Sequence, residues 1–302
     1  MFVKEVLAKG SALLASAQNN TAKIETPFLD AALLLAEVLH TDRAGLVVRE
    51  KEIVSMENCD LFQNLLKRRM EGECIAYLLG RKEFYGLEFL VNPAVLVPRP
   101  ETETLVEAAI NACKNLKNTS PKKIRILDLC TGSGAAAIAF KHEIQDSEVW
   151  ASDISAEALE TAKRNSKKLL GNLSGDFEPV HFIQSDLFNE LFNHIENNSL
   201  DLIMANPPYI TADEISSLPP EVRHEPKLAL DGGKDGMDLI RKIISGAKSF
   251  LCPGGLLLLE ADPRQIPVIR LDFEDNSYEN ICIYRDLSDE RVISAVNDSA
   301  RK

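Results

Sequence analysis

The chain has 302 residues, enough for one α/β domain of about 200 residues and a smaller second domain. Its net charge of −12, from 46 acidic and 34 basic side chains, repels phosphates and argues against nonspecific binding to nucleic acid. The apolar runs are too short to cross a bilayer, Lys4, Glu5 and Lys9 interrupt any signal-peptide core, and six scattered cysteines suggest neither disulfides nor zinc. We therefore expect a cytoplasmic protein that binds no membrane.

Residues 1–80 have apolar residues at three- and four-residue spacings, which predicts a small helical domain. Asp30 precedes a run of alanines and leucines and is the expected N-cap, with Pro27 ending whatever lies before it. Residues 83–97 change to aromatic and β-branched side chains, which favours a β-hairpin. The predicted organisation is a helical domain over residues 1–80, a hairpin linker over 81–97 and an α/β domain over 98–302.

In the α/β domain, strand-like runs alternate with helical ones after the Pro98-Arg99-Pro100 break. A helix is expected over 101–113 and another over 135–140. The expected strands are residues 124–129, 148–152, 181–184, 200–205, 255–260, 281–284 and 291–295. Such alternation predicts a doubly wound, mostly parallel sheet of the Rossmann-like class, with the last two strands as an antiparallel edge pair.

A glycine-containing loop follows the first of these strands and opens a helix, so its backbone can approach a ligand at a helix amino terminus. Two acids end the next two strands: Asp153 at the position that takes ribose hydroxyls in nucleotide-binding folds, and Asp186, suited to an adenine amino group. In the alternative interpretation the glycines serve only the turn, Asp153 is the N-cap of the following helix and Asp186 caps the following turn. The combination, followed by the motif at 206, indicates S-adenosylmethionine.

The most informative motif is Asn206-Pro207-Pro208-Tyr209, which follows the apolar strand 200–205. The carboxyl ends of strands are where open α/β sheets bind ligands. Asn206 offers an amide, the prolines fix the backbone carbonyls and Tyr209 offers an aromatic face, so the motif predicts a site that grips an amide or amino nitrogen. A plain strand-ending turn is the alternative, since Asn-Pro is a common turn signal.

These motifs, together with others along nearly the whole chain, resemble the glutamine N5-methyltransferases that modify class I peptide chain release factors. The others are EGECIAYLLG at 71–80, EFYG at 83–86, VPRPETE at 97–103, RHEP at 223–226 and GGKDG at 232–236. The resemblance implies a class I methyltransferase domain that binds S-adenosylmethionine and methylates the glutamine of a Gly-Gly-Gln loop. The implied partner is the release factor, and we expect a monomer that does not bind nucleic acid directly.

By position, the resemblance assigns cofactor binding to the loop, to the two strand-end acids and to the start of the motif: Cys130, Thr131, Gly132, Ser133, Gly134, Asp153, Asp186, Leu187 and Asn206. The catalytic and substrate-binding residues are Asn206, Pro207, Pro208 and Tyr209, and no metal is expected. The chain departs from the family at three positions: Cys130 replaces a common glycine, Cys74 a frequent proline, and Leu187 an aromatic. A cysteine favours negative φ, so we expect ordinary backbone at 130.

The implied chemistry is transfer to a poor nucleophile, since an amide lone pair is delocalised into its carbonyl. The Asn206 side-chain oxygen and the Pro207 carbonyl would accept the two amide hydrogens while Tyr209 stacks on the amide plane. Three alternatives stay open: methylation of a ribosomal-protein glutamine, adenine-N6 methylation of DNA, and a catalytically idle cofactor-binding protein. The helical domain is expected to dock the protein substrate.

Overall fold

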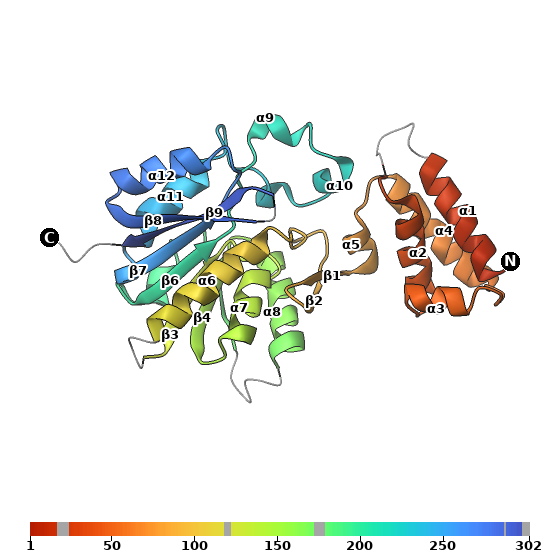
Figure 1. The fold of residues 1–302 in the computed structure, drawn as a ribbon, viewed down its shortest axis with the longest axis horizontal. Helices are drawn as coiled ribbons and strands as arrows, with labels where there is room; N and C mark the ends of the chain where they lie inside the picture. The colour runs from red at the N-terminus through yellow and green to blue at the C-terminus, as the bar shows by residue number, and fades with distance from the viewer. Residues whose placement is uncertain (17–23, 118–121, 172–178, 287, 298–302) are drawn as a thin grey trace. The chain divides into compact units, whose positions relative to one another are not determined.

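The computed structural model describes residues 1–16, 24–117, 122–171, 179–286 and 288–297, in two compact units (Figure 1). The smaller, the helical unit, comprises Met1–Arg81 and Ser217–Glu225. The larger, the sheet unit, comprises Lys82–Ser216 and Pro226–Lys302. The segment Ser217–Glu225, which the sequence pattern groups with residues 98–302, therefore packs with the helical unit, and we call it the returning segment. No helix among the described residues is both long and apolar enough to span a bilayer.

The helical unit has its own apolar core, packed between its helices. Its elements are α1 (Val3–Ser16), α2 (Pro27–Val38), α3 (Arg43–Val48), α4 (Met56–Met70), α5 (Ile75–Leu79) and, from the returning segment, α10 (Pro220–Arg223). Asp42 caps α3 and Ser55 caps α4, each accepting a backbone N–H three residues on. The expectation for Asp30 is wrong: Pro27 starts α2, because its fixed φ suits the first helical position, and Asp30 lies inside the helix.

Asp30 instead forms a buried ion pair with Arg69 at the centre of the helical unit. The Arg69 Nε lies 2.7 Å from Asp30 Oδ2, and both side chains are about 95% buried, at 4% and 5% exposed. Other nitrogens of the same guanidinium donate to Glu221 of the returning segment and to the Glu73 carbonyl. One arginine therefore joins α2, the turn after α4 and α10.

Close packing at Gly72 seats the returning segment. Gly72 has φ +98°, and a Cβ there would lie 2.9 Å from Pro220 and 3.1 Å from His224. The His224 ring in turn lies 2.8 Å from the Pro220 carbonyl through Nδ1. The EGE sequence at 71–73 and the RHEP sequence at 223–226, far apart in the chain, thus meet in one packing arrangement.

The sheet unit confirms the predicted doubly wound fold. Its seven strands have the order β5-β4-β3-β6-β7-β9-β8. They are β3 (Ile124–Leu129), β4 (Ser147–Asp153), β5 (His181–Gln184), β6 (Leu200–Ala205), β7 (Leu251–Glu260), β8 (Tyr278–Arg285) and β9 (Glu290–Asn297). The first five are mutually parallel, while β9 pairs antiparallel with both β7 and β8. The predicted antiparallel pair is present, with β8 at the edge.

Helices cover both faces of this sheet, with α6, α7 and α8 on one side and α11 and α12 on the other (Figure 1). They are α6 (Thr102–Lys117), α7 (Ala135–Glu143), α8 (Ala156–Leu170), α11 (Asp238–Ala247) and α12 (Ile266–Asp275), with the short α9 (Ala212–Ile215), η2 (Leu191–Asn193) and η3 (Lys227–Ala229) in the loops. Along β6, Leu202 and Met204 enter the core under α6 and α7, while Ile203 and Ala205 enter the other core. Burial on both faces explains the continuous apolar strands.

The hairpin is shorter than the sequence predicts. It consists of β1 (Arg81–Phe84) and β2 (Leu87–Leu90) only, and residues 91–97 form an irregular segment. Asn92 shapes that segment, because its side-chain oxygen accepts the Ala94 N–H and its Nδ2 donates to Thr161. An Asx turn that runs from Asn92 through Pro93 to Ala94 therefore ends the strand pattern.

The buried Arg69 makes a testable contribution to stability. We expect Arg69→Met to destabilise the helical unit by about 3 kcal/mol, because it leaves the Asp30 carboxylate buried without its counter-ion. The midpoint of urea unfolding measured by far-UV circular dichroism should move to lower urea concentration. The midpoint measured by the fluorescence of Trp150 should not move, because this single tryptophan belongs to the sheet unit.

The matched control is Arg68→Met. Arg68 pairs with Glu73 across two hydrogen bonds, but its side chain is 44% exposed, so its loss should cost less than about 1 kcal/mol. Equal shifts for the two variants would contradict the importance of the buried pair.

Candidate functional site

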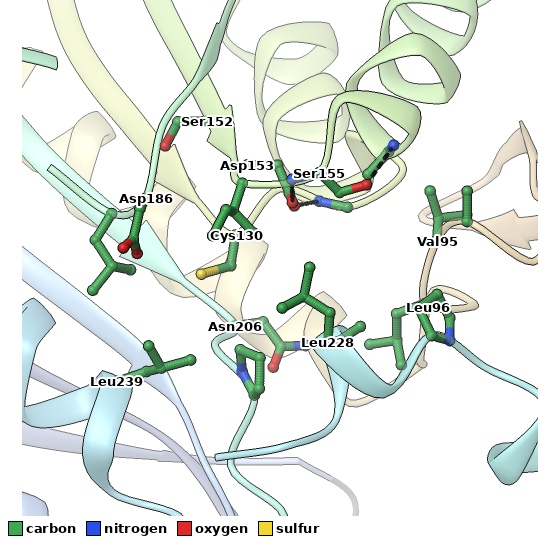
Figure 2. A pocket seen from close by; sticks show the side chains of 18 of the residues that line it. Val95, Leu96, Cys130, Ser152, Asp153, Ser155, Asp186, Asn206, Leu228 and Leu239 are labelled. Atoms are coloured by element: carbon green, nitrogen blue, oxygen red, sulfur yellow. Dashed lines mark hydrogen bonds between the residues drawn. The ribbon is translucent and has the colours of Figure 1, made fainter. Parts of the chain in front are cut away.

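A pocket opens where the carboxyl ends of β3, β4, β5 and β6 meet, and all of its lining residues belong to the sheet unit (Figure 2). The lining includes six of the nine residues predicted to bind a cofactor: Cys130, Gly132, Asp153, Asp186, Leu187 and Asn206. Adjacent ends of parallel strands bring together residues that span 77 positions of the sequence, from 130 to 206. The predicted edge of the sheet is therefore a hollow lined by the predicted side chains.

Cys130 does not have the ordinary backbone that its sequence suggests. Its φ is +58°, in the left-handed region that favours glycine, so the expectation of negative φ is wrong. The turn demands this conformation, because the next residue, Thr131, donates its N–H to the Ser152 carbonyl of the neighbouring strand. Burial, with Asp153 nearby, raises the pKa of the Cys130 thiol, which therefore stays protonated at neutral pH and acts as part of the pocket wall.

The other loop residues shape the turn. Thr131 is buried, and its hydroxyl donates to Asp128 Oδ2 at 2.6 Å. The Ser133 carbonyl accepts from Asn165, and Gly134, at φ +80°, allows close packing of Ile138 and Ala162. Thr131, Ser133 and Gly134 are therefore outside the pocket wall and support it from behind.

Asp128 at the end of β3 anchors this loop from inside. Its Oδ2 also accepts the Ala137 N–H of α7 at 3.2 Å. Burial raises the pKa of Asp128 to about 7, opposed by the hydrogen bonds from Thr131 and Ala137. The carboxyl thus ties the strand, the loop and the helix together.

Asp153 joins the glycine loop to the start of α8. Its two carboxyl oxygens accept backbone N–H groups from Gly132 and Ser155, each at 2.9 Å (Figure 2). Burial raises the pKa of Asp153, while these donors favour its charged form. The cap of α8 is Ser155, whose hydroxyl accepts from Ala158, so Asp153 is not the N-cap. Each carboxyl oxygen has a second lone pair for a ligand hydroxyl.

Asp186 lines the pocket. The turn after β5 is held by Ser185, whose hydroxyl donates to the Leu187 carbonyl and accepts the Glu190 N–H. Leu187 itself has φ +49°. Among the described residues, the side chain that holds this turn is therefore Ser185.

The motif after β6 is partly in the pocket and partly behind it. Asn206 and Pro208 line the pocket, whereas Pro207 and Tyr209 do not. The Asn206 Nδ2 donates to the hydroxyl of Thr102 at 3.1 Å. Among the described residues, no donor reaches Asn206 Oδ1 or the Pro207 carbonyl oxygen. Two acceptors of the predicted substrate grip are therefore uncommitted.

The GGKDG sequence packs directly behind this motif. A Cβ at Gly232 would lie 2.7 Å from the Tyr209 Cα, and one at Gly236 would clash with the Tyr209 carbonyl oxygen. Gln265 donates to that same oxygen at 3.0 Å and to the Gly236 carbonyl at 3.2 Å. The glycines are thus required so that residues 206–209 can lie close to their supporting loop.

Apolar walls of the pocket are the part that sequence patterns miss. They come from the irregular segment after the hairpin, from the loop beyond the returning segment and from α11: Ala94, Val95, Leu96, Pro226, Leu228, Ala229 and Leu239. In Figure 2, Val95 and Leu96 lie on the opposite side of the pocket from Asp186 and Leu239. Only Pro226, within RHEP, belongs to a motif that sequence inspection marks.

Other charged residues of the motifs have structural partners. Glu103 accepts the Tyr85 N–H at 2.9 Å and so ties α6 to the hairpin. Arg223 and His224 belong to the helical unit, outside the pocket. No group of three or more histidine, cysteine or acidic side chains in the described ranges is arranged to hold a metal ion.

Comparison with known proteins first defines the class. The family model described as the methyltransferase small domain matches residues 109–218, and the PrmC N-terminal domain matches residues 5–80. In fold, the chain is similar to the hMettl16 catalytic domain solved in complex with the MAT2A 3′UTR hairpin 1. That match has TM-score 0.55 and 14% identity, over 79% of this chain and 82% of the other. The sheet unit is a class I methyltransferase fold.

Sequence relatives then define the family. Release factor glutamine methyltransferase of Burkholderia pseudomallei (strain K96243) is 39% identical over 80% of this chain and 82% of its own length. The protein of the same name from Rhodopirellula baltica (strain DSM 10527 / NCIMB 13988 / SH1) is 38% identical over 89% of each chain. The chain belongs to the release factor glutamine methyltransferase family and is a methyltransferase.

The close packing behind Tyr209 can be tested with two glycine variants. Gly236→Ala and Gly254→Ala both place a side chain at positive φ, +73° and +82°, which should cost about 1 kcal/mol each. Only Gly236→Ala pushes a Cβ against Tyr209, because nothing lies within 4 Å of the Cβ at Gly254. We expect Gly236→Ala to lower methyl transfer by about 10- to 100-fold, since small misplacements are costly in catalysis.

The measurement is the initial rate of methyl transfer for both variants, with the melting temperature as a check on folding. Gly254→Ala should keep the rate of the unaltered chain. Equal rates for the two variants would mean that the packing at Gly236 does not position residues 206–209.

Proposed function

We propose that the chain transfers a methyl group from S-adenosylmethionine to the side-chain amide N5 of the glutamine in the Gly-Gly-Gln motif of class I release factors, in support of translation termination. Family membership supports the reaction class. The observation that carries the assignment to this site is the pair of uncommitted acceptors at Asn206 and Pro207, beside a pocket of the kind that nucleotide-like cofactors require.

The residues of the pocket fit S-adenosylmethionine, which when bound supplies an electrophilic methyl group. Asp153 has lone pairs for the ribose hydroxyls and is held rigidly by two backbone donors. Asp186 and Leu187 offer a carboxylate and an apolar contact for the adenine, and Leu228 and Leu239 add apolar walls. Cys130 has a left-handed backbone conformation, and nothing lies within 4 Å of the Cβ position at Gly132, so the cofactor has room against the loop backbone.

Asn206 and Pro207 orient the substrate amide. The substrate nitrogen has two hydrogens, and Asn206 Oδ1 and the Pro207 carbonyl would accept one each, which aims the nitrogen at the methyl donor. Pro208 has no N–H to donate and disfavours helical backbone at Pro207, so the Asn206 and Pro207 carbonyls are not drawn into a helix. The Tyr209 ring would pack on the amide plane, and burial raises the pKa of its hydroxyl, so it remains neutral.

The alternative substrates fit the chain less well. Adenine-N6 methylation presents a similar amino group, but the net charge of −12 disfavours DNA. A ribosomal-protein glutamine would need the same grip, and the match of residues 5–80 to the PrmC N-terminal domain favours the release factor. An idle protein would have no use for the uncommitted acceptors. The proposal includes a cytoplasmic monomer that binds neither nucleic acid nor membrane.

Asn206 separates cofactor binding from transfer. We expect Asn206→Ala to bind S-adenosylmethionine within about 3-fold of the unaltered chain but to lose at least about 100-fold in methyl transfer, because the amide grip is gone. Asn193→Ala, at an exposed position of η2, is the control. The assay follows labelled methyl transfer to a release factor, to the same factor with its loop glutamine changed to alanine, and to adenine-containing DNA.

Label on the intact factor alone supports the assignment. Label on DNA, or on the factor lacking its glutamine, would refute the substrate, and retained transfer by Asn206→Ala would refute the grip.

The helical unit is proposed to dock the protein substrate. Several of its large apolar side chains are exposed to solvent, among them Val47 at 71% and Val48 at 85%. Exposed apolar patches are typical of protein–protein contact sites. We expect Val47→Asp/Val48→Asp to raise KM for an intact release factor by about 10-fold without changing turnover of a Gly-Gly-Gln peptide.

The control for this docking test is Leu271→Asp on α12 of the sheet unit, where the leucine is 60% exposed. An unchanged KM for the double variant would argue against docking through this face, and a matching loss on the peptide would indicate damage to the fold.

A further inference from the structure

Glu260 is a buried acid for which the fold alone gives no reason. It ends β7, is 1% exposed, and its Oε2 has no hydrogen-bond partner among the described residues. A buried carboxylate costs free energy unless it is paired, so an apolar residue would suit this position better for stability. Its carboxyl is hydrogen-bonded to the side chain of Thr102.

Thr102 connects Glu260 to the substrate grip. It is 6% exposed and is the first residue of α6, and its hydroxyl accepts from Asn206 Nδ2 at 3.1 Å. A hydroxyl has one hydrogen to donate and two lone pairs to accept with. When Glu260 is ionised it can only accept, so the Thr102 hydrogen goes to Glu260 and Thr102 can only accept from Asn206.

The direction of these hydrogen bonds determines which end of the Asn206 amide faces the substrate. With Nδ2 held by Thr102, Oδ1 points away from Thr102 and is free to accept a substrate N–H. We infer that Glu260 is a positioning residue, which acts through Thr102 to hold Asn206 in the one amide orientation that can bind a glutamine amide nitrogen. This inference rests on the proposed function and deepens it.

Protonation of Glu260 would reverse the chain of donors. A neutral carboxyl can donate to Thr102, whose hydroxyl is then free to donate to Asn206 Oδ1. The Asn206 amide would turn and present its own N–H groups to the hydrogens of the substrate amide. The hydrogen bonds from Asn206 through Thr102 to Glu260, which we call the relay, therefore hold the required amide orientation only while Glu260 is charged.

The surroundings place this protonation near neutral pH. Burial raises the pKa of Glu260 to about 7, Thr102 opposes the shift, Glu101 and Asp286 raise the pKa further, and Arg291 lowers it. The Tyr209 hydroxyl also interacts with Glu260, and its own raised pKa keeps it neutral throughout. Since the charged form is the working form, kcat should fall as the pH drops through about 7.

The test measures kcat and KM for release-factor methylation between about pH 6 and pH 9, at saturating S-adenosylmethionine. The unaltered chain should lose rate on the acid side with a midpoint near pH 7. Glu260→Gln should lower kcat at pH 8 by about 10-fold and remove this acid limb, with KM and cofactor affinity within about 2-fold. Glu160→Gln, on an exposed part of α8, should leave both unchanged.

Two Thr102 variants test the middle of the relay. Thr102→Ser keeps the hydroxyl and should retain the acid limb and rates within about 3-fold, whereas Thr102→Val should behave as Glu260→Gln. The double variant Thr102→Val/Glu260→Gln should lose no more rate than either single variant, because the two residues act through one path.

An acid limb that persists in Glu260→Gln, or losses that add in the double variant, would overturn the relay. If Glu260→Gln failed to bind the cofactor, the contrast between Thr102→Ser and Thr102→Val would decide, and equal rates for these two would overturn it. Failure of the unaltered chain to label the release-factor glutamine would instead overturn the proposed function.

Discussion

Burial of the parallel strands on both faces is the constraint from which the site follows. Neighbouring residues of β6, such as Leu202 and Ile203, point into opposite cores, so the body of the strand has no surface for chemistry. Reactive side chains can lie only beyond the strand ends. Asp153, Asp186 and Asn206 all lie at or just beyond such ends, and the parallel direction brings them to one edge.

The catalytic motif depends on a shell of residues that never touch the pocket. Gln265 and the glycines at 232 and 236 fix the Tyr209 backbone, and Thr102 fixes the Asn206 side chain. Proline carbonyls are useful acceptors only if their position is set from behind, because catalysis is sensitive to small displacements. The chain therefore uses sequence far from residue 206 to aim four consecutive residues.

Sequence reasoning locates the strands and the polar ends of the site because both depend on local patterns. Four of the predicted strands match within one residue at each end, and Asp153 and Asn206 lie where the motifs place them. It fails where tertiary demand overrides local preference. The turn after β3 needs positive φ whichever residue occupies it, so Cys130 adopts it. The apolar wall at Leu228 and the partner of Asp30, 39 residues away, leave no local signal.

The returning segment Ser217–Glu225 means that the helical unit is not contiguous in the sequence. A fragment ending at residue 80 would lack Glu221, a partner of Arg69, and the residues that pack against Gly72. The helical unit therefore cannot be exchanged between relatives as one continuous segment, and both of its sequence segments would have to be exchanged together.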